Sequence, residues 1–452
     1  MESATRPARP DKGAELDLVI DSLAYGGKGV ARADGYVVFV GGVVPGDRVR
    51  AVLTKRKRGY GEARLVQLLE PGAERIDPVA HHPGAPWQVL PYERQIEIKA
   101  QQVDDALKRI GGLRGYELDD IVPAAERWRY RNKLEFSFGT GPEGDLRLGF
   151  HPPGRWAEVA PMDDCLLGSE RVEGARRAVL AWASEAGLSA HDRRTHEGLL
   201  RNLVVREGRR TGQLQVRLVT GPGEIDADSL ARAVDCDGLL WTRTARLAET
   251  TMGGETELIA GDEHLEEELG GLRLSISPEA FFQTNTEMAD VLYGVAGEFA
   301  SLGGIERVYD LFCGIGTISL LLAPRAGEIW GLEIVEGAVA NAIANASANE
   351  ITNARFFAGD VRLALGELVE EAGRPDVLVL DPPRAGLSAK VVRRVIEAAP
   401  KRIVYVSCNP TTLAPNAAQL VEAGYALRRV RPVDMFPQTP HIECVALLER
   451  AS

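Results

Sequence analysis

Residues 305–452 alternate short apolar runs with helical patterns, and no other feature of the sequence restricts the fold as strongly. The apolar runs cover residues 307–312, 328–333, 354–358, 376–380, 402–407, 425–433 and 442–448. Continuous apolar strands that alternate with helices are typical of a doubly wound, mostly parallel α/β sheet. No helical pattern separates the last two runs, so we expect them to pair as an antiparallel hairpin at one edge.

Residues 11–70 have a different pattern, in which glycine turns break short β-type runs at 15–20, 35–40, 47–53 and 62–69. This spacing predicts a small OB-like β-barrel. A basic cluster with an aromatic neighbour lies between the last two runs, and it consists of Lys55, Arg56, Lys57, Arg58 and Tyr60. Such a cluster is either a solvated hairpin tip or a surface that neutralises RNA phosphates and stacks on a base.

The middle of the chain, residues 71–275, is less regular. A helix is expected over residues 91–110, between a proline and two glycines, and β-type segments near 133–139, 199–207, 213–220 and 272–277 predict an antiparallel unit. Residues 127–133 interleave four cations with Trp128 and Tyr130. Exposure without a partner is one interpretation, but this mixture favours RNA contact, with Arg131 and Lys133 among the contacts and both rings stacking.

Composition places the chain among ordinary globular proteins. Its 452 residues are 45% apolar, and the longest nearly apolar stretch, residues 311–323, is too short to span a bilayer. No secretory signal is evident, so we expect a cytoplasmic protein with no membrane partner. The net charge of −12 hides a basic surplus in residues 1–70. Five widely spaced cysteines predict neither a disulfide framework nor CxxC zinc ligands.

A glycine-rich turn follows the first strand of the expected sheet and leads into a helix. Asp310 precedes the turn, Gly314 and Gly316 form a short GxG, and Glu333 ends the next strand. The glycines allow close approach of a ligand, and a carboxylate at Glu333 can accept both hydroxyls of a ribose. Many tight strand-to-helix turns look similar, but the short GxG with this acid fits a nucleoside cofactor better than NAD. Asp360, at the end of the third strand, is placed to meet an adenine edge.

Two further motifs fall at strand ends of the same sheet. Residues 381–384 read Asp-Pro-Pro-Arg, and Cys408 follows the next strand. Taken separately, the first is a proline-stiffened turn and the second a small buried apolar residue. Because the carboxyl ends of parallel strands line one crevice, both motifs are expected beside the glycine turn.

Together these motifs resemble the S-adenosylmethionine-dependent RNA uracil-C5 methyltransferases, which make 5-methyluridine in transfer and ribosomal RNA. The likeness is strongest to the bacterial ribosomal branch with an N-terminal TRAM barrel, and it is carried by residues 55–61, 90–92, 130–133, 281–285, 310–316, 381–384, 407–410 and 436–443. It implies a TRAM barrel over 11–70, a mainly β central domain over 71–275 and a Rossmann-like class I methyltransferase domain over 276–452. It also implies S-adenosylmethionine as cofactor and RNA as partner, rRNA before tRNA, and we expect a monomer.

The resemblance also assigns roles to individual residues. The residues implied around the cofactor or target base are Gln283, Phe312, Thr317, Glu333, Asp360 and Asp381. Cys408 would be the nucleophile, Glu443 the general base, and Arg384 would hold the uracil edge together with Asp381. The chemistry agrees, because C5 of uracil becomes nucleophilic only after a thiolate adds at C6, and a base must later remove the C5 proton.

One departure from the family pattern concerns iron. Many relatives bind an iron–sulfur cluster through closely spaced cysteines before the Leu-Pro-Tyr motif, but residues 79–87 contain none here, and only Cys165 lies near the fourth position. We therefore expect no iron–sulfur cluster and no metal site, and we interpret His81 and His82 as a polar turn.

Three other functions remain open. The first is the same chemistry on tRNA. The second is exocyclic-amine methylation, whose post-strand motif normally ends in an aromatic residue where this chain has Arg384, and which has no use for Cys408. The third, a non-catalytic RNA-binding protein, explains the basic segments alone.

Overall fold

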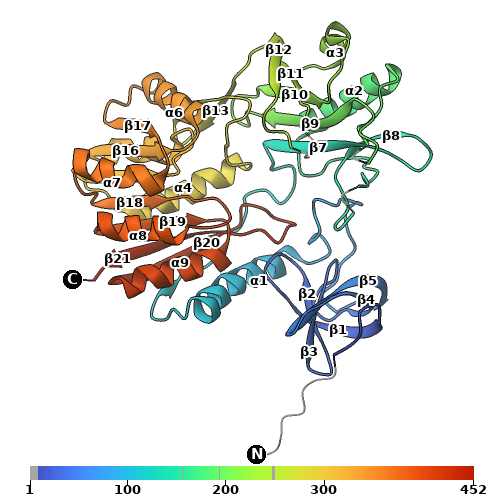
Figure 1. Cartoon of the computed structure of the whole chain (residues 1–452), viewed down its shortest axis with the longest axis horizontal. Coiled ribbons are helices and arrows are strands. Elements are labelled where there is room, and N and C mark those ends of the chain that lie inside the picture. The colour runs from blue at the N-terminus through green and yellow to red at the C-terminus, as the bar shows by residue number, and fades with distance from the viewer. Residues whose placement is uncertain (1–8, 156, 193, 247–249, 452) are drawn as a thin grey trace, which may run out of the picture.

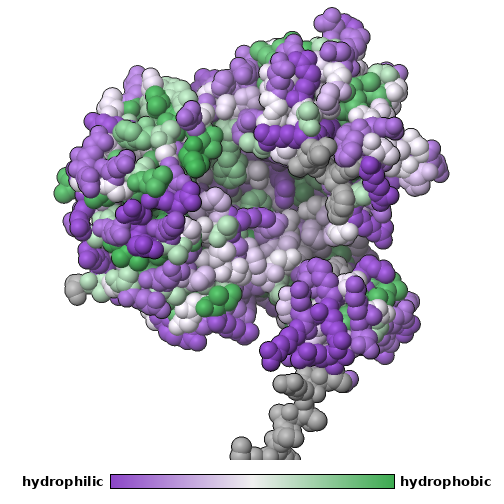
Figure 2. Space-filling model, in the orientation of Figure 1, coloured by the Kyte–Doolittle hydropathy of each residue, from purple (hydrophilic) through white to green (hydrophobic). Residues whose placement is uncertain are grey.

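A computed structural model describes residues 9–155, 157–192, 194–246 and 250–451. The chain forms a barrel, a middle lobe and a C-terminal α/β lobe, and the space-filling view shows the surface hollowed between them (Figures 1 and 2). Within the described ranges, no helix is long and apolar enough to cross a bilayer.

The N-terminal lobe is a closed five-stranded barrel. Its strands are β1 (Glu15–Leu23), β2 (Gly29–Ala33), β3 (Tyr36–Val40), β4 (Arg48–Arg56) and β5 (Tyr60–Glu70), in the order β1-β2-β3-β5-β4, with β4 closing onto β1. Apolar side chains that alternate along the strands fill the interior. The sequence predicted the barrel but missed β2, which is short and holds only one large apolar residue, Val30.

The middle lobe contains a six-stranded sheet covered on one face by α2 (Glu170–Glu185) and α3 (Ala227–Ala233). The sheet order is β12-β11-β10-β9-β7-β8, and its strands are β7 (Lys133–Thr140), β8 (Leu146–Gly149), β9 (Leu200–Glu207), β10 (Leu214–Thr220), β11 (Gly238–Arg243) and β12 (Glu255–Gly261). All neighbours pair antiparallel except β10 and β11. The expected strand at 272–277 lies outside this sheet: β14 (Leu272–Ile276) pairs with β13 (Leu265–Leu269), and this hairpin packs into the C-terminal core.

The C-terminal lobe is built on the doubly wound sheet that the sequence predicted. Its strands are β15 (Arg307–Leu311), β16 (Glu328–Glu333), β17 (Ala354–Ala358), β18 (Val377–Leu380), β19 (Arg402–Ser407), β20 (Tyr425–Val433) and β21 (Glu443–Arg450). The order is β17-β16-β15-β18-β19-β21-β20-β6, where β6 (Glu117–Leu118) comes from the middle of the chain. The expected hairpin forms, with β21 antiparallel between β19 and β20, and β6 adds a short parallel edge.

Helices cover both faces of this sheet (Figure 1). The helices α4 (Thr286–Ala300), α5 (Thr317–Leu322) and α6 (Glu336–Ala348) share one apolar core with one sheet face. The other face packs against α7 (Val361–Ala372), α8 (Ala389–Ala398) and α9 (Pro410–Glu422). The strand order reverses between β15 and β18, and ligands of such sheets bind in the crevice at that point.

The helix α1 (Tyr92–Asp105) links the barrel to the C-terminal lobe and continues into a π-helical segment over Ala106–Ile110. Together they match the helix predicted over residues 91–110. Its buried face carries Lys99, whose Nζ lies 2.6 Å from Oδ1 of Asp434 and 2.9 Å from the carbonyl oxygen of Phe436. The Tyr92 hydroxyl donates to the other oxygen of Asp434 at 2.9 Å. Burial lowers the pKa of Lys99, and the charge of Asp434 opposes that effect. The contacts of Lys99 anchor α1 to the loop that follows β20.

We predict that Lys99→Met destabilises the protein, because Asp434 is fully buried and would lose its ionic partner. Removing one partner of a buried pair costs about 3–5 kcal/mol. Urea unfolding followed by tryptophan fluorescence should show a lower midpoint. Lys108→Met is the matched control, since it breaks an exposed pair with Asp104 at the end of the same helix. Equal midpoints for the two variants would contradict a central role for the buried pair.

Candidate active site

The turn after β15 is backbone-strained and open. Phe312 has φ +69° and Gly316 has φ +83°, and a Cβ added at Gly314 would meet no atom within 4 Å. A non-glycine residue in the left-handed region costs free energy and is concentrated at functional sites. Thr317 begins α5 directly after this turn. The turn therefore leaves its backbone accessible to a ligand.

Asp310, the next-to-last residue of β15, is a buried acid with spare hydrogen-bonding capacity. One of its oxygens accepts from the amide of Ser319 at 3.1 Å and from its hydroxyl at 2.6 Å. Among the described residues the other oxygen, Oδ1, has no hydrogen-bond partner. Burial raises the pKa of Asp310 to about 6 although the Ser319 contacts lower it. An unpaired buried acceptor of this kind fits a cationic group of a ligand.

Glu333 ends β16 and Asp360 lies two residues after the end of β17, and their carboxylates are held differently. Glu333 accepts from the amides of Gly314 at 3.2 Å and of Ile334 at 2.7 Å, and it remains partly exposed. Asp360 caps α7 and forms an ion pair with Arg362, and these contacts lower its pKa to about 2. Glu333 is therefore tied to the glycine turn, whereas the adenine contact expected of Asp360 stays a prediction.

Asp381 follows β18 and lies across the switch point from Asp310. Desolvation, and then the charge of Asp310, raises the pKa of Asp381 to about 7. Tyr293 of α4 lies nearby: its own pKa is raised by burial and by Asp381, and a hydrogen bond with Gln283 opposes that rise. The structure thus brings Gln283, Asp310 and Asp381 together at one place.

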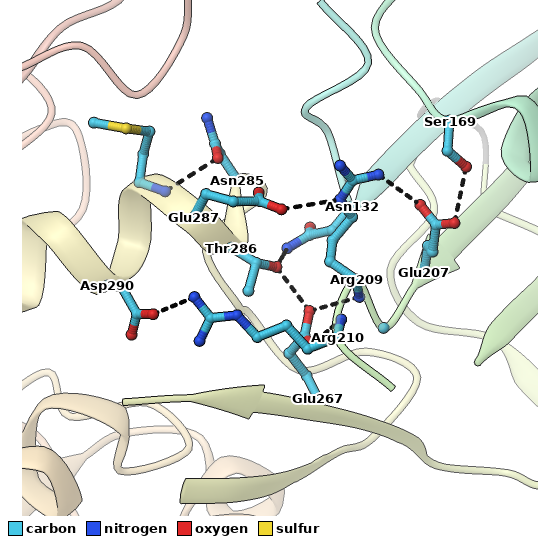
Figure 3. A network of polar contacts seen from close by, with 12 residues as sticks. Asn132, Ser169, Glu207, Arg209, Arg210, Glu267, Asn285, Thr286, Glu287 and Asp290 are labelled. Atoms are coloured by element: carbon cyan, nitrogen blue, oxygen red, sulfur yellow. Dashed lines mark hydrogen bonds and ion pairs between the residues drawn. The ribbon is translucent and has the colours of Figure 1, made fainter. Parts of the chain in front are cut away.

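A polar network fixes the segment that carries Gln283 (Figure 3). The amide group of Asn132 donates to the carbonyl oxygen of Gln283 and to the Thr286 hydroxyl, each at 2.8 Å. The Thr286 hydroxyl in turn donates to Glu267 at 2.7 Å. Asn285 caps α4 through the amide of Met288. Through Asn132, the middle lobe thereby holds the buried Gln283 and the start of α4, which belongs to the C-terminal lobe.

Cys408 and Glu443 face each other because of the register between β19 and β21. Ser407 pairs with Cys444 in this antiparallel ladder, so the next residue of one strand, Cys408, lies opposite the preceding residue of the other, Glu443. Burial raises the pKa of the Cys408 thiol to about 11, and the charge of Glu443 adds to this effect. Burial and Asp381 likewise raise the pKa of Glu443 well above its usual range. A thiol and a carboxyl group are thus held together in a desolvated place.

Arg384 supplies the positive charge at this place. It lowers the pKa values of both Cys408 and Glu443 and so opposes the effect of burial, which raises them. Its guanidinium lies 3.2 Å from Nδ1 of His441, while the side-chain amide of Asn409 donates to its carbonyl oxygen at 3.0 Å. Burial, then Arg384, lowers the pKa of His441 to about 4, so this imidazole is neutral.

The loop over residues 434–441 leads into Glu443, and side chains from early in the chain hold it. Besides Lys99, the amide of Gln95 donates to Gln438 at 2.8 Å, and the Tyr130 hydroxyl donates to the carbonyl oxygen of Pro437 at 3.1 Å. No role was predicted for Gln95 or Lys99. In the sequence, the one feature that marks these two residues is their helical spacing as polar residues within the predicted helix.

The basic cluster of the barrel forms the tip of the β4–β5 hairpin, as predicted. Lys55 lies 3.4 Å from Glu62, and Arg56 lies 3.5 Å from Asp11, while the Lys57 and Arg58 side chains are exposed. The ring of Tyr60 is 41% exposed and contacts Phe39 edge-on with ring centroids 5.5 Å apart. This tip is accessible to a ligand, and the RNA contacts expected of it stay predictions.

The stretch 127–133 differs from its predicted arrangement. Tyr130 is fully buried in the core of the middle lobe. The prediction that its ring stacks on RNA is therefore wrong. Lys133 lies 2.6 Å from Glu135, and burial lowers its pKa. The Arg131 guanidinium lies 5.8 Å from the ring centroid of Phe436, next to the loop that leads to Glu443. Arg131 and Lys133 therefore already have protein neighbours, and the RNA contacts expected of them stay predictions.

Residues 79–87, where the family pattern places iron–sulfur ligands, are only partly buried: Ala85 and Trp87 lie in apolar clusters, whereas Val79 is exposed. His81 is exposed and His82 begins a turn, in which the amide of Ala85 donates to the His82 carbonyl oxygen, but the His82 side chain is buried. Its Nε2 lies 3.5 Å from the buried Sγ of Cys165. Burial lowers the pKa of His82 to about 4. In the part of the chain that the structure describes, no group of three or more His, Cys, Asp or Glu side chains lies together as metal ligands. One thiol and one imidazole do not fit a cluster that needs four thiolates.

Comparisons with known proteins agree with this architecture. A sequence model described as tRNA (uracil-5-)methyltransferase matches residues 262–451, and the TRAM domain model matches residues 11–66. An RNA methyltransferase of Bacteroides thetaiotaomicron is 40% identical, over 94% of this chain and all of the relative. One from Halalkalibacterium halodurans is 36% identical, over 97% of this chain and 98% of the relative.

A solved structure has the same overall fold. It is the tRNA (uracil-54, C5)-methyltransferase of Pyrococcus abyssi in complex with S-adenosyl-L-homocysteine, and it is 28% identical with a TM-score of 0.78. The match covers 96% of this chain and all of that one.

The fold and site define a class I methyltransferase with an N-terminal TRAM barrel. More narrowly, the chain belongs to the S-adenosylmethionine-dependent RNA uracil-C5 methyltransferase family.

We predict that Glu443→Gln lowers the pKa of the Cys408 thiol, because a negative charge that opposes the thiolate is removed. Iodoacetamide should then label the Cys408 peptide several-fold faster near neutral pH, as followed by mass spectrometry across a pH series. Arg384→Gln should act in the opposite direction, since Arg384 favours the thiolate. Glu449→Gln, at the far end of the same strand, is the control. An unchanged labelling profile in Glu443→Gln would show that the two groups do not interact.

Proposed function

We propose that this protein methylates carbon 5 of a uridine in RNA through a covalent adduct between Cys408 and carbon 6 of the base. The observation that carries the proposal is the register of β19 and β21, which sets a thiol opposite a buried carboxyl group beside the switch point of the sheet. Exocyclic-amine methylation needs no such pair, and RNA binding alone needs neither group.

The residues around the glycine turn fit S-adenosylmethionine. Glu333 would accept from the ribose hydroxyls, and the unpartnered Oδ1 of buried Asp310 suits the ammonium group. Phe312, Thr317 and Gln283 would border the same crevice, with Asp360 at the adenine end. When bound, the cofactor supplies an electrophilic methyl group that the activated carbon 5 accepts.

Cys408 would add to carbon 6 as a thiolate, which transfers electron density to carbon 5. In the free protein the raised pKa keeps the thiol protonated, and the Arg384 guanidinium is the positive group that favours ionisation. Asp381, whose pKa is about 7, and Arg384 would hold the polar edge of uracil and place the ring over the thiol.

Glu443 would remove the carbon 5 proton after methyl transfer, so that the Cys408 sulfur leaves carbon 6. A carboxyl group with a strongly raised pKa is a better proton acceptor than an ordinary surface carboxylate. Side chains hold the loop over residues 434–441 and so fix the backbone just before Glu443, which limits movement of the Glu443 carboxyl group while it removes the proton.

The proposed RNA target is rRNA, following the resemblance to the ribosomal branch, and tRNA is the alternative. RNA affinity would come from Lys55, Arg56, Lys57, Arg58 and Tyr60 at the barrel tip, together with Arg131 and Lys133. Mapping of 5-methyluridine in rRNA and tRNA from a strain that lacks the gene decides between the two classes.

Cys408→Ala should abolish formation of 5-methyluridine while the fold and cofactor affinity stay near normal, because the half-buried thiol contributes little packing. Digestion of RNA to nucleosides after incubation with tritiated cofactor measures the product. Target RNA that contains 5-fluorouridine should form a denaturation-resistant adduct with the wild type, since fluorine cannot leave as a proton. Cys236→Ala is the matched control, as it truncates another half-buried cysteine. Methylation by Cys408→Ala, or a methylated amine as product, would overturn the proposal.

Glu333→Gln should weaken S-adenosylmethionine binding about tenfold, because charge-assisted hydrogen bonds are replaced by weaker neutral ones. Isothermal titration calorimetry measures the affinity. Glu336→Gln provides the control, since Glu336 is an exposed acid in the first turn of α6. If both variants bind like the wild type, Glu333 does not hold the ribose.

A further inference from the structure

The loop between β1 and β2 of the barrel lies against the catalytic residues. The hydroxyl of Tyr25 donates to the carbonyl oxygen of Cys408 at 3.0 Å, across 383 positions of sequence. The Tyr25 ring is half-buried and packs with the apolar core of the C-terminal lobe. A barrel that served only as an RNA tether would not need to reach the candidate nucleophile.

Two neighbouring contacts fix this loop. The side-chain amide of Gln102 in α1 donates to the carbonyl oxygen of Leu23 at 3.0 Å. A Cβ added at Gly27 would lie 3.0 Å from Cβ and Cγ of Pro440 and 3.2 Å from Nε1 of Trp87. The loop therefore fits closely against the segment that leads to Glu443.

The environment of Tyr25 is that of the site itself. Burial, and then the neighbouring Cys408, raises the pKa of Tyr25 to about 12, with Arg384 opposing the rise and Glu443 adding to it. The phenol therefore remains a hydrogen-bond donor near neutral pH.

We propose that Tyr25 is a positioning residue for the nucleophile, and that the TRAM barrel completes the active site as well as contacting RNA. The inference rests on the proposed covalent mechanism, in which the place of the Cys408 sulfur decides the rate of addition.

The position of Cys408 in the fold explains why an external anchor matters. Ser407 is the last residue of β19 that pairs with β21, and α9 begins at Pro410. Cys408 therefore lies between two regular elements, outside the hydrogen-bond ladder. Tyr25 of the barrel donates to the carbonyl oxygen of Cys408, and the next residue, Asn409, donates to the carbonyl oxygen of Arg384. Small displacements of a reacting atom lower rates strongly.

The test replaces Tyr25 by phenylalanine, which removes the hydroxyl and keeps the ring. Tyr425→Phe is a close control, because the Tyr425 hydroxyl donates to the carbonyl oxygen of Pro400 at 2.9 Å, just before the other end of β19. We expect Tyr25→Phe to lower kcat, and the rate of adduct formation with 5-fluorouridine RNA, about tenfold, with RNA KM and cofactor Kd within about twofold of the wild type. Tyr425→Phe should leave both rates unchanged.

A second pair of variants tests the loop without touching the hydroxyl. Gly26 and Gly27 both have φ +85°, so alanine strains the backbone equally at either position, but only at Gly27 does the new Cβ meet Pro440 and Trp87. Gly27→Ala should therefore slow adduct formation more than Gly26→Ala does.

The outcomes separate this inference from the proposed function. If the wild type forms neither adduct nor 5-methyluridine, the proposed function fails. If the wild type forms both and Tyr25→Phe matches Tyr425→Phe in kcat and adduct rate, the positioning role fails. A rise in RNA KM at unchanged kcat also overturns it, since Tyr25 would then contact RNA. Thermal unfolding of both variants checks that a lower rate does not reflect a lost fold.

Discussion

The antiparallel insertion of β21 between β19 and β20 is the constraint on which the site depends. In an all-parallel sheet the start of a last strand would lie at the edge opposite the crevice. Because β21 runs in reverse, its first residue, Glu443, reaches the same rim as Cys408 at the end of β19. One reversed strand therefore converts a cofactor-binding sheet into a site that also carries a thiol and a carboxyl group.

The reversed strand requires a loop between β20 and β21 whose polar groups need partners, and the N-terminal half of the chain supplies them. The loop between β20 and β21 crosses the rim and would expose its backbone without partners. Instead, buried side chains occupy its polar groups: Lys99 contacts Asp434 and the Phe436 carbonyl, while Gln95 and Tyr130 bind further along. A buried ion pair is weak support for stability in itself, but it specifies one arrangement of the loop. Burial also raises the pKa of Glu443, to which the loop leads.

The local sequence predicted the C-terminal sheet well because strand-like runs alternate with helical patterns along the chain. The predicted runs at 328–333, 354–358, 402–407 and 425–433 coincide with β16, β17, β19 and β20. Other strands were missed: β2 is short, and β12 is mostly exposed and gives no alternation. The buried β11 was missed as well. Rim positions such as Asp381 and Cys408 were also predictable, since strand ends of a parallel sheet share one edge. The burial of Tyr130 was not, because an aromatic residue among cations has the same local pattern in a core as on a surface.

Contacts between distant parts of the chain account for what the sequence did not predict. Lys99 and Asp434 are 335 positions apart, and Gln95 and Gln438 are 343 apart. No periodicity or motif links such residues, since each is an ordinary polar residue in its own segment. They meet because α1 leaves the barrel and packs against the helical layer that contains α9. The barrel, α1 and the middle lobe therefore all determine the geometry of a loop that the catalytic lobe encodes. For this reason the rim residues can be identified from the C-terminal lobe alone, whereas the groups that hold them in place belong to the whole chain.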